Sequence, residues 1–297
     1  MQLLSNPTLR LFVGASLISL SPVWVKLVTV SPTTSAFWRL AIGGCVIGAY
    51  LLITRRRLRF SSQVWLALLL AALFLAVDLW FYHRSIQFIG PGLSTLLANF
   101  QVFVMAAAGL LILREPPTGR QLIAIPLALF GLALIVGIDW QSLAAEYRLG
   151  ILFGLAAAIT YAAYLLSMRY SRRDSTNRVP SREIAVVSLV GAAILGAIAL
   201  GEGEQLALSQ RDDVMWLVCY GVLSHGFGML FITSSLPHVT TTQAGLALLL
   251  QPTLSFAWDV LFFARSMTPV ELCGAAIALF AIYLGSRSRS EQAQGAR

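Results

Sequence analysis

The residues of this chain best able to do chemistry are ionisable side chains inside long apolar segments. Arg39, Asp78 and His225 each lie within such a segment. A charge is costly in the interior of a bilayer, so such a residue normally faces a cavity or a charged partner. A guanidinium can bind a carboxylate, a carboxylate can bind an amine or a proton, and an imidazole exchanges a proton near neutral pH. These residues therefore predict a binding or proton-transfer site inside a membrane.

The pairing of these charges has open alternatives. Arg39 and Asp78 could form a structural ion pair, or Arg39 could pair with Asp259. Both could instead serve a substrate or a proton. Asp78 and Tyr82 are four residues apart on a helix, so they face the same side. For His225, a hydrogen bond within the core is the alternative to proton coupling.

Uncharged polar and aromatic side chains form a second group. Asn99, Gln101 and Gln251 fall at equivalent depths of two similar stretches, where their amides could bind a substrate. The alternative is helix-to-helix hydrogen bonding, worth about 0.6 kcal/mol on average. Tyr161 and Tyr164 lie deep in one apolar segment and could line a cavity. The predicted substrate-binding residues are Trp24, Arg39, Asp78, Tyr82, Asn99, Gln101, Tyr161, Tyr164, His225 and Gln251.

Two prolines inside apolar segments mark candidate gates. Pro22 follows Ser21 in the first segment, and Pro252 follows Gln251 in a late one. Proline removes a backbone hydrogen bond and kinks a helix. We therefore expect helices to rock around Pro22 and Pro252.

The composition requires lipid as the solvent of this chain. It has 297 residues, of which 58% are hydrophobic and 11% charged; soluble domains carry roughly 25% charged residues. Lipid allows only helices or closed barrels, and continuous apolar runs of about 20 residues are typical of helices. The net charge of +8 comes largely from arginines in short loops, which argues against a nucleic-acid partner.

No motif for catalysis or for a cofactor is present in the sequence. Cys45, Cys219 and Cys273 lie in apolar runs without metal or redox spacing. There is no glycine-rich phosphate loop, His-Glu metal pair or nucleophile elbow. We therefore expect no metal, no cofactor and no enzymatic activity.

The apolar segments predict an all-α integral membrane protein. Arginine is concentrated in alternate loops, for example at 55–59 and 169–182, whereas the opposite loops carry acids. Cytoplasmic loops are the positively charged ones, so both termini are expected in the cytoplasm. Ten segments are predicted, at 8–28, 33–54, 63–87, 92–113, 119–138, 149–170, 181–201, 214–236, 241–262 and 269–286.

An internal repeat relates the two halves of the chain. The stretch 78–137 reads as helix, charged turn (114–118) and helix, and a similar order returns at 228–285, with the triplet Ala128-Leu129-Phe130 repeated as Ala278-Leu279-Phe280. Five helices per half is an odd number, so the second half enters the membrane upside down. Residues 1–140 and 141–297 are therefore expected to be two inverted five-helix repeats with a substrate site between them.

Several short motifs accompany this repeat: Trp24 with Lys26, Pro32 with Arg39, the turn 113–119 and the run Leu248-Leu249-Leu250-Gln251-Pro252. With the helix count and the repeat, they make the chain resemble the drug/metabolite transporter superfamily, specifically its EamA-type ten-helix members. The resemblance covers nearly the whole chain. Gln101 stands where a proline would complete the first copy of the family's leucine-run motif.

The resemblance implies a secondary transporter in the inner (plasma) membrane that exports small metabolites, with amino acids the leading substrates. Proton coupling through Asp78 or His225 is a further expectation. Efflux of lipophilic cations is the second interpretation, and it needs a carboxylate at Asp78 that Arg39 does not neutralise. A membrane enzyme and a channel are alternatives of a different class. The former lacks catalytic residues, and the broken, repeated helices favour rocking over a fixed pore.

Overall fold

The computed structural model describes residues 6–55, 60–111, 119–136, 143–171, 180–239 and 241–295, and all regular structure within them is helical. The predicted charged turn at 114–118 and the predicted boundary between 140 and 141 lie outside these residues. The first part of the chain forms α1 (Pro7–Ser19), α2 (Ser21–Leu27), α3 (Pro32–Ile53), α4 (Ser62–Ala98), α5 (Gln101–Leu111) and α6 (Gly119–Val136). The second part forms α7 (Ala145–Ser171), α8 (Pro180–Gly201), α9 (Arg211–Cys219), the π-helix η3 (Tyr220–Phe227), α10 (Gly228–Ser235), the 3₁₀ turn η4 (Leu236–His238), α11 (Thr241–Phe263) and α12 (Pro269–Gly295).

The helices are long and apolar enough for a membrane-spanning fold. In the described chain, six helical units reach the length and hydropathy of a membrane span: Pro7–Leu27, Pro32–Ile53, Ser62–Leu111, Ala145–Ser171, Ser181–Gly201 and Arg211–Ser235. Shorter apolar helices cover Leu122–Ile135, Leu249–Phe263 and Pro269–Leu284. The unit Ser62–Leu111 has 50 residues, whereas one crossing needs about 20.

A sharp break divides α4 at Gly90. Its φ of 82° and ψ of 168° are not helical, and such a positive φ suits only glycine without strain. Pro91 follows and has no backbone N–H to donate. The sequence predicted two separate apolar segments here, 63–87 and 92–113, and Gly90 and Pro91 lie between them. In the structure this break is so tight that α4 runs on in a new direction.

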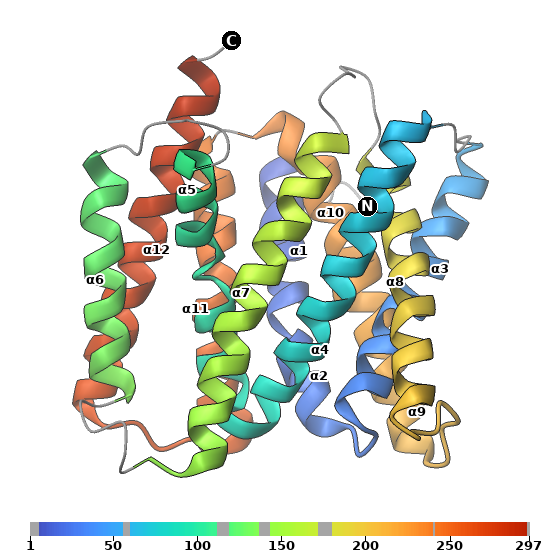
Figure 1. Cartoon of the computed structure of the whole chain (residues 1–297), viewed down its shortest axis with the longest axis horizontal. Coiled ribbons are helices and arrows are strands. Elements are labelled where there is room, and N and C mark those ends of the chain that lie inside the picture. The colour runs from blue at the N-terminus through green and yellow to red at the C-terminus, as the bar shows by residue number, and fades with distance from the viewer. Residues whose placement is uncertain are drawn as a thin grey trace.

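The helices pack as one bundle (Figure 1). The α6–α12 pair forms one end and the α3–α8 pair the other, while α4 and α7 cross in the middle. Gly131 of α6 and Gly274 of α12 lie in direct backbone contact, since a Cβ on Gly131 would lie 2.7 Å from the carbonyl oxygen of Gly274. These small residues allow the two helices to approach closely, as is typical of helix pairs in membranes.

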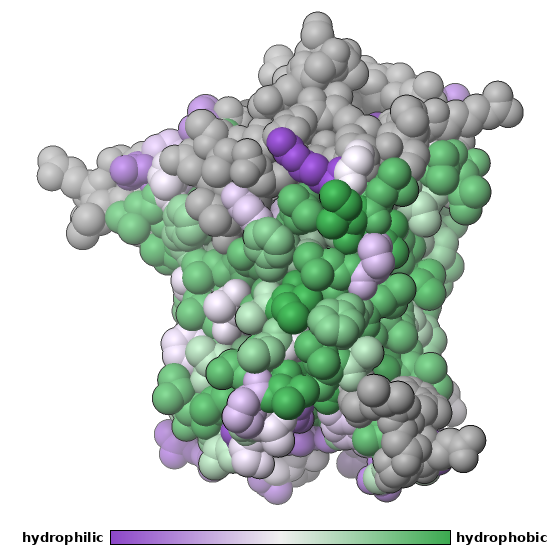
Figure 2. Space-filling view, turned by 90° about the vertical axis from the view of Figure 1, so that its left-hand side faces the viewer, coloured by the Kyte–Doolittle hydropathy of each residue, from purple (hydrophilic) through white to green (hydrophobic). Residues whose placement is uncertain are grey.

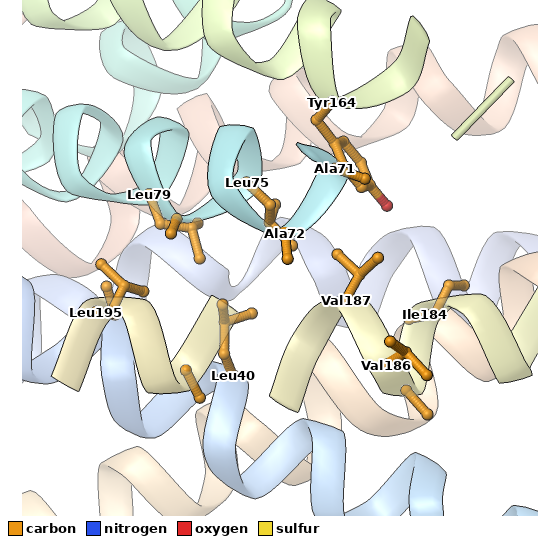
Figure 3. Close-up of a cluster of buried hydrophobic side chains, with 14 of the residues drawn as sticks. Leu40, Ala71, Ala72, Leu75, Leu79, Tyr164, Ile184, Val186, Val187 and Leu195 are labelled. Atoms are coloured by element: carbon orange, nitrogen blue, oxygen red, sulfur yellow. The ribbon is translucent and has the colours of Figure 1, made fainter. Parts of the chain in front are cut away.

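The main apolar core lies between α3, α4 and α8 (Figure 3). Leu40 of α3, Leu79 of α4 and Leu195 of α8 are all buried there. The outer surface has the opposite character. Figure 2 shows an apolar belt between more polar ends, and Phe130 and Phe280 in the α6–α12 pair are 55% and 56% exposed. Lipid is the solvent that such a surface requires.

Candidate functional site

A central cavity of about 280 Å³ lies where the helices of the two parts meet. Residues from α1, α2, α3, α4, α5, α7, α8, η3, α10 and α11 line it. The lining includes these residues singled out from the sequence: Pro22, Arg39, Asp78, Tyr82, Asn99, Gln101, Tyr161, Tyr164, His225 and Gln251. The fold therefore gathers side chains as far apart in the chain as Pro22 and Gln251.

A helix break between α1 and α2 borders the cavity. Pro22 lies in the first turn of α2. Two carbonyls near the break accept hydrogen bonds from other helices: Leu17 O from Ser224 Oγ at 2.6 Å, and Ser19 O from Ser255 Oγ at 3.0 Å. Backbone groups freed by a break need such partners inside a membrane. Polar side chains of η3 and α11 thus hold this interruption in place.

Arg39 is anchored on the wall of the cavity. Its Nη1 donates to the hydroxyl of Tyr220 at 2.8 Å, and the guanidinium carbon lies 5.1 Å from the centre of that ring. The Tyr220 hydroxyl also lies 3.0 Å from His83 Nε2, and the two rings are stacked. We call Tyr220 and His83 the Arg39 anchor. Both are fully buried, and neither lines the cavity.

Asp78 faces the same cavity from α4 and is 5% exposed. Within the described part of the chain, its carboxylate forms no hydrogen bond and no ion pair. One turn further along, the hydroxyl of Tyr82 lies 2.8 Å from Thr95 Oγ1. Thr95 donates its own proton to Pro91 O at 2.7 Å, so Tyr82 is the donor to Thr95. The cavity thus holds a carboxyl group and a guanidinium group that do not form an ion pair with each other.

The alternative pairings suggested by the sequence are not found in the structure. Asp78 and Arg39 do not form an ion pair, and Asp259 is bound to Arg265 instead, with 3.3 Å between Oδ2 and Nη1. Asp259 Oδ2 also accepts from Gly92 N at 2.9 Å, and Arg265 Nη1 donates to Ile89 O at 3.0 Å. This pair therefore satisfies backbone groups on both sides of the Gly90 break.

His225 lies in the π-helix η3, on the cavity wall. Its Nε2 lies 2.8 Å from Ser188 Oγ of α8, and its Nδ1 is buried without a partner in the described chain. Gly43 of α3 makes room for the ring, since a Cβ there would lie 2.4 Å from His225 Cδ2. Single π-turns inside α-helices occur frequently at functional sites.

Amides and two further tyrosines complete the lining. Asn99 Nδ2 donates to Thr95 O at 2.8 Å, next to the interruption between α4 and α5. Gln101 Oε1 is buried with no partner in the described residues. The rings of Tyr161 and Tyr164 lie 5.2 Å apart and give the cavity an aromatic side. Unpaired polar atoms beside aromatic surface suit a small ligand with both polar and apolar parts.

Two of the predicted residues are not part of the lining. Trp24 donates from Nε1 to Ser224 Oγ at 3.1 Å and stacks on Trp216 at 5.6 Å, so its side chain supports the α2–η3 contact. Pro252 is buried within α11 but does not border the cavity. Gln251 lines the cavity and its neighbour Pro252 does not, because Gln251 and Ser255 lie on the face of α11 that is turned to the cavity.

Sequence reasoning missed a second polar region, which joins the turn at 29–34 to the second part of the chain. Thr33 Oγ1, Trp80 Nε1 and Arg84 Nη2 donate to Glu202 at 2.7, 2.9 and 3.0 Å. We call these four residues the Glu202 cluster. Glu204 accepts from Ser31 and Thr34, and Asp213 accepts from the amide and hydroxyl of Thr29 at 2.8 and 2.7 Å. The only sequence signal was a group of acids in the loops.

The Glu202 cluster shifts the pKa of its carboxyl group. Burial acts to raise the pKa of Glu202 from its ordinary value of 4.5. Hydrogen bonds from Thr33 and Trp80, together with the charge of Arg84, lower it by more than burial raises it, so the net pKa lies below that value.

Comparison with known proteins gives the family. The sequence model described as the EamA-like transporter family matches residues 8–137 and again residues 148–287. The chain belongs to the EamA-like transporter family. It is therefore a membrane transporter, and the resemblance inferred from its motifs is confirmed.

Relatives agree with this membership of the EamA-like family. An uncharacterized inner membrane transporter, YhbE of Escherichia coli (strain K12), is 26% identical over 262 residues, which cover 83% of this chain and 80% of the relative. An uncharacterized transporter of Archaeoglobus fulgidus is 23% identical over 169 residues, 57% of each chain. A crystal structure of another protein shares the fold with a TM-score of 0.67 at 19% identity, over 94% of this chain and 97% of that one.

Proposed function

We propose that this EamA-like protein exports small organic metabolites, chiefly amino acids, from the cytoplasm by alternating access, with the substrate bound in the central cavity. The observation that carries this proposal is the pair of opposite charges, Arg39 and Asp78, that line one cavity without forming an ion pair. A buried charge without a partner is costly, so these groups are suited to the two charged ends of a zwitterion. Tyr161 and Tyr164 offer apolar surface for its side chain.

The size of the cavity also favours this class of substrate. Its volume of about 280 Å³ lies just below the range of about 300–1,000 Å³ that is typical of pockets for drug-sized ligands. An amino acid fits such a volume more readily than a bulky drug does.

Efflux of lipophilic cations remains the second candidate, because Asp78 carries a carboxylate that no described residue pairs with. The charge of Arg39 in the same cavity opposes a cation that lacks a carboxylate. Amines are therefore included in the transport test below.

We also propose that ten spans form two inverted five-helix repeats, 1–140 and 141–297. The family model matches the chain in two stretches, which supports two similar halves. The helix contacts also occur in pairs related by such a repeat: α4 packs on α7 as α10 packs on α1, and α4 packs on α8 as η3 packs on α3. The repeated residues Ala128 and Ala278 are both buried in the α6–α12 contact.

The side of the membrane toward which the cavity extends is the basis for proposing which conformation of the transport cycle this structure represents. Its lining includes Met168 near the end of α7, Ile184 near the start of α8 and Leu236 after α10. The arginine-rich stretch 169–182 includes the end of α7 and the start of α8, so this side is proposed to be cytoplasmic, with both termini there. The Glu202 cluster then closes the outer side. In this state an exporter in the inner membrane would take up substrate from the cytoplasm.

Reconstituted transport tests the proposal. Purified protein in liposomes would be assayed with a panel of radiolabelled amino acids with apolar side chains and with phenethylamine, with and without a pH gradient. We expect saturable transport of at least one amino acid, and a rise of about tenfold or more in its KM in Arg39→Gln and Asp78→Asn, because each variant removes one charged contact. A strong response to the pH gradient would support proton coupling.

Two results would contradict the proposal. Transport of phenethylamine alone would favour cation efflux, and unchanged KM values in both variants would show that these charges do not bind the substrate. Ser85→Ala is the matched control, since Ser85 is a buried hydroxyl of α4 that bonds to Gly150 O away from the cavity.

A further inference from the structure

We propose that Tyr220, supported by His83, holds Arg39 away from Asp78 and so presents a free guanidinium edge to the carboxylate of the substrate. The inference rests on the proposed function, in which Arg39 and Asp78 bind opposite ends of an amino acid. Tyr220 and His83 do not border the cavity, so they act as positioning residues.

The hydrogen bonds of the Arg39 anchor have a defined direction. A guanidinium can only donate, so the Tyr220 oxygen accepts from Arg39 Nη1 at 2.8 Å. The single proton of that hydroxyl is then available to His83 Nε2, 3.0 Å away. Within the described residues no other acceptor bonds to this hydroxyl, so His83 Nε2 accepts its proton, and His83 is then a neutral imidazole with its own proton on Nδ1. The chain of donors runs from Arg39 through Tyr220 to His83.

This arrangement occupies only one nitrogen of Arg39. Within the described residues, the bond from Nη1 is its single hydrogen bond, and Nε is buried without a partner. The edge formed by Nε and Nη2 is thus left for a ligand. Two parallel N–H groups on one edge match the two oxygens of a carboxylate, which is the strongest geometry for an arginine.

The anchor also explains why two opposite charges in one cavity stay apart. Arg39 and Asp78 attract each other, and the attraction is strong where water is scarce. They form no ion pair, because Nη1 is bonded to the Tyr220 hydroxyl behind the cavity wall and the guanidinium carbon lies beside the Tyr220 ring. Without the hydroxyl, the guanidinium would turn toward Asp78 and the site would neutralise itself. Tyr220 therefore preserves both binding charges.

A four-variant comparison tests this directly. The probe is the des-amino analogue of the best amino acid substrate, for example 4-methylpentanoate for leucine, because it offers a carboxylate and no amine. Its dissociation constant would be measured by binding to purified wild type, Tyr220→Phe, Asp78→Asn and the double variant. When Asp78 is unchanged, we expect Tyr220→Phe to weaken binding of the probe about tenfold. In the Asp78→Asn background, the same substitution should weaken binding less than about threefold. The reason is that Arg39 then has no carboxylate to turn toward.

The coupling between the two substitutions separates positioning from simple structural support. Equal losses in both backgrounds, or no loss in either, would overturn the inference. His83→Phe gives a second route if Tyr220→Phe does not fold, and it should show the same pattern with a smaller loss. Ser85→Ala should bind the probe as wild type does. Failure of the proposed function would be seen separately, as a wild type that transports no amino acid at all.

Discussion

Glu202 shows how a single carboxylate can join three segments of this protein. It accepts hydrogen bonds from α3 through Thr33 and from α4 through Trp80 and Arg84. The Arg84 guanidinium also lies over the Trp80 ring at 3.8 Å, which fixes its direction. An exposed ion pair alone contributes little. The shared acceptor, with several donors in fixed positions, is what makes this contact specific.

The lowered pKa of Glu202 predicts a pH-dependent contribution to stability. A group whose folded-state pKa is depressed stabilises the fold above its ordinary value, here 4.5, and loses this contribution as the pH falls through the depressed value. We expect Glu202→Gln to lower the melting temperature at pH 7, with the difference from wild type shrinking as the pH falls below 4.5. Thermal unfolding in detergent across this range measures it.

The exposed Glu146 provides the control for this measurement, since Glu146→Gln should leave the melting temperature unchanged across the same pH range. A Glu202→Gln difference that stays constant as the pH falls from 7 to below 4.5 would mean that the carboxylate charge is not the source of the effect.

The break in α4 is the clearest case of an element whose shape depends on distant residues. Gly90 and Pro91 interrupt the helix, and an interruption leaves backbone N–H and C=O groups that lipid cannot satisfy. Asp259 binds the free N–H of Gly92, and Arg265 binds the carbonyl of Ile89. The ion pair at the end of α11, between Asp259 and Arg265, thus replaces missing helical hydrogen bonds of α4 and couples the two segments.

Removing the carboxylate of Asp259 should therefore destabilise the whole bundle. Asp259→Ala leaves the Gly92 amide and the Arg265 guanidinium without their partner, and breaking such a buried pair costs about 3 kcal/mol. The free energy of unfolding in mixed micelles, or the melting temperature as its proxy, would register the loss. Asp212→Ala, at an exposed position in the first turn of α9, is the control. Wild-type stability of Asp259→Ala would rule out a clamp at the Gly90 break.

The whole molecule combines an apolar belt, a polar region around Glu202 and a central cavity between its helices. If each half crosses the membrane five times, five crossings separate the start of α4 from the start of α9. The two starts then lie on opposite sides of the membrane. Single cysteines at Gln63 and Asp212, both exposed near these starts, test this orientation. Cys45, Cys219 and Cys273 would first be replaced by serine.

We expect an impermeant maleimide to label Asp212→Cys in intact cells, and Gln63→Cys only after the membrane is opened, because the loop before α4 carries arginines and should be cytoplasmic. The reverse pattern would contradict the orientation. Labelling of both cysteines from the same side would contradict five crossings between them, and with it the inverted repeat.

The sequence by itself determined that the chain needs a lipid environment, that its elements are helices, and where most of these helices lie. Apolar length and charge composition fix these, so the predicted segments 33–54 and 181–201 nearly coincide with α3 and α8. It also indicated which polar residues needed an explanation, because Arg39 and Asp78 stand out in apolar surroundings. The count of ten spans and the substrate roles of these residues stay predictions.

Only the tertiary structure decided which partner each of these groups has. Arg39 binds Tyr220, which is 181 residues away, and Asp259 binds Arg265 and the Gly92 amide rather than Arg39. Helical periodicity gives the depth and face of a side chain, but many residues on other helices share the same depth. The choice among them depends on how close the helices pack, and positions such as Gly43 and Gly131 set that distance only once the bundle is assembled.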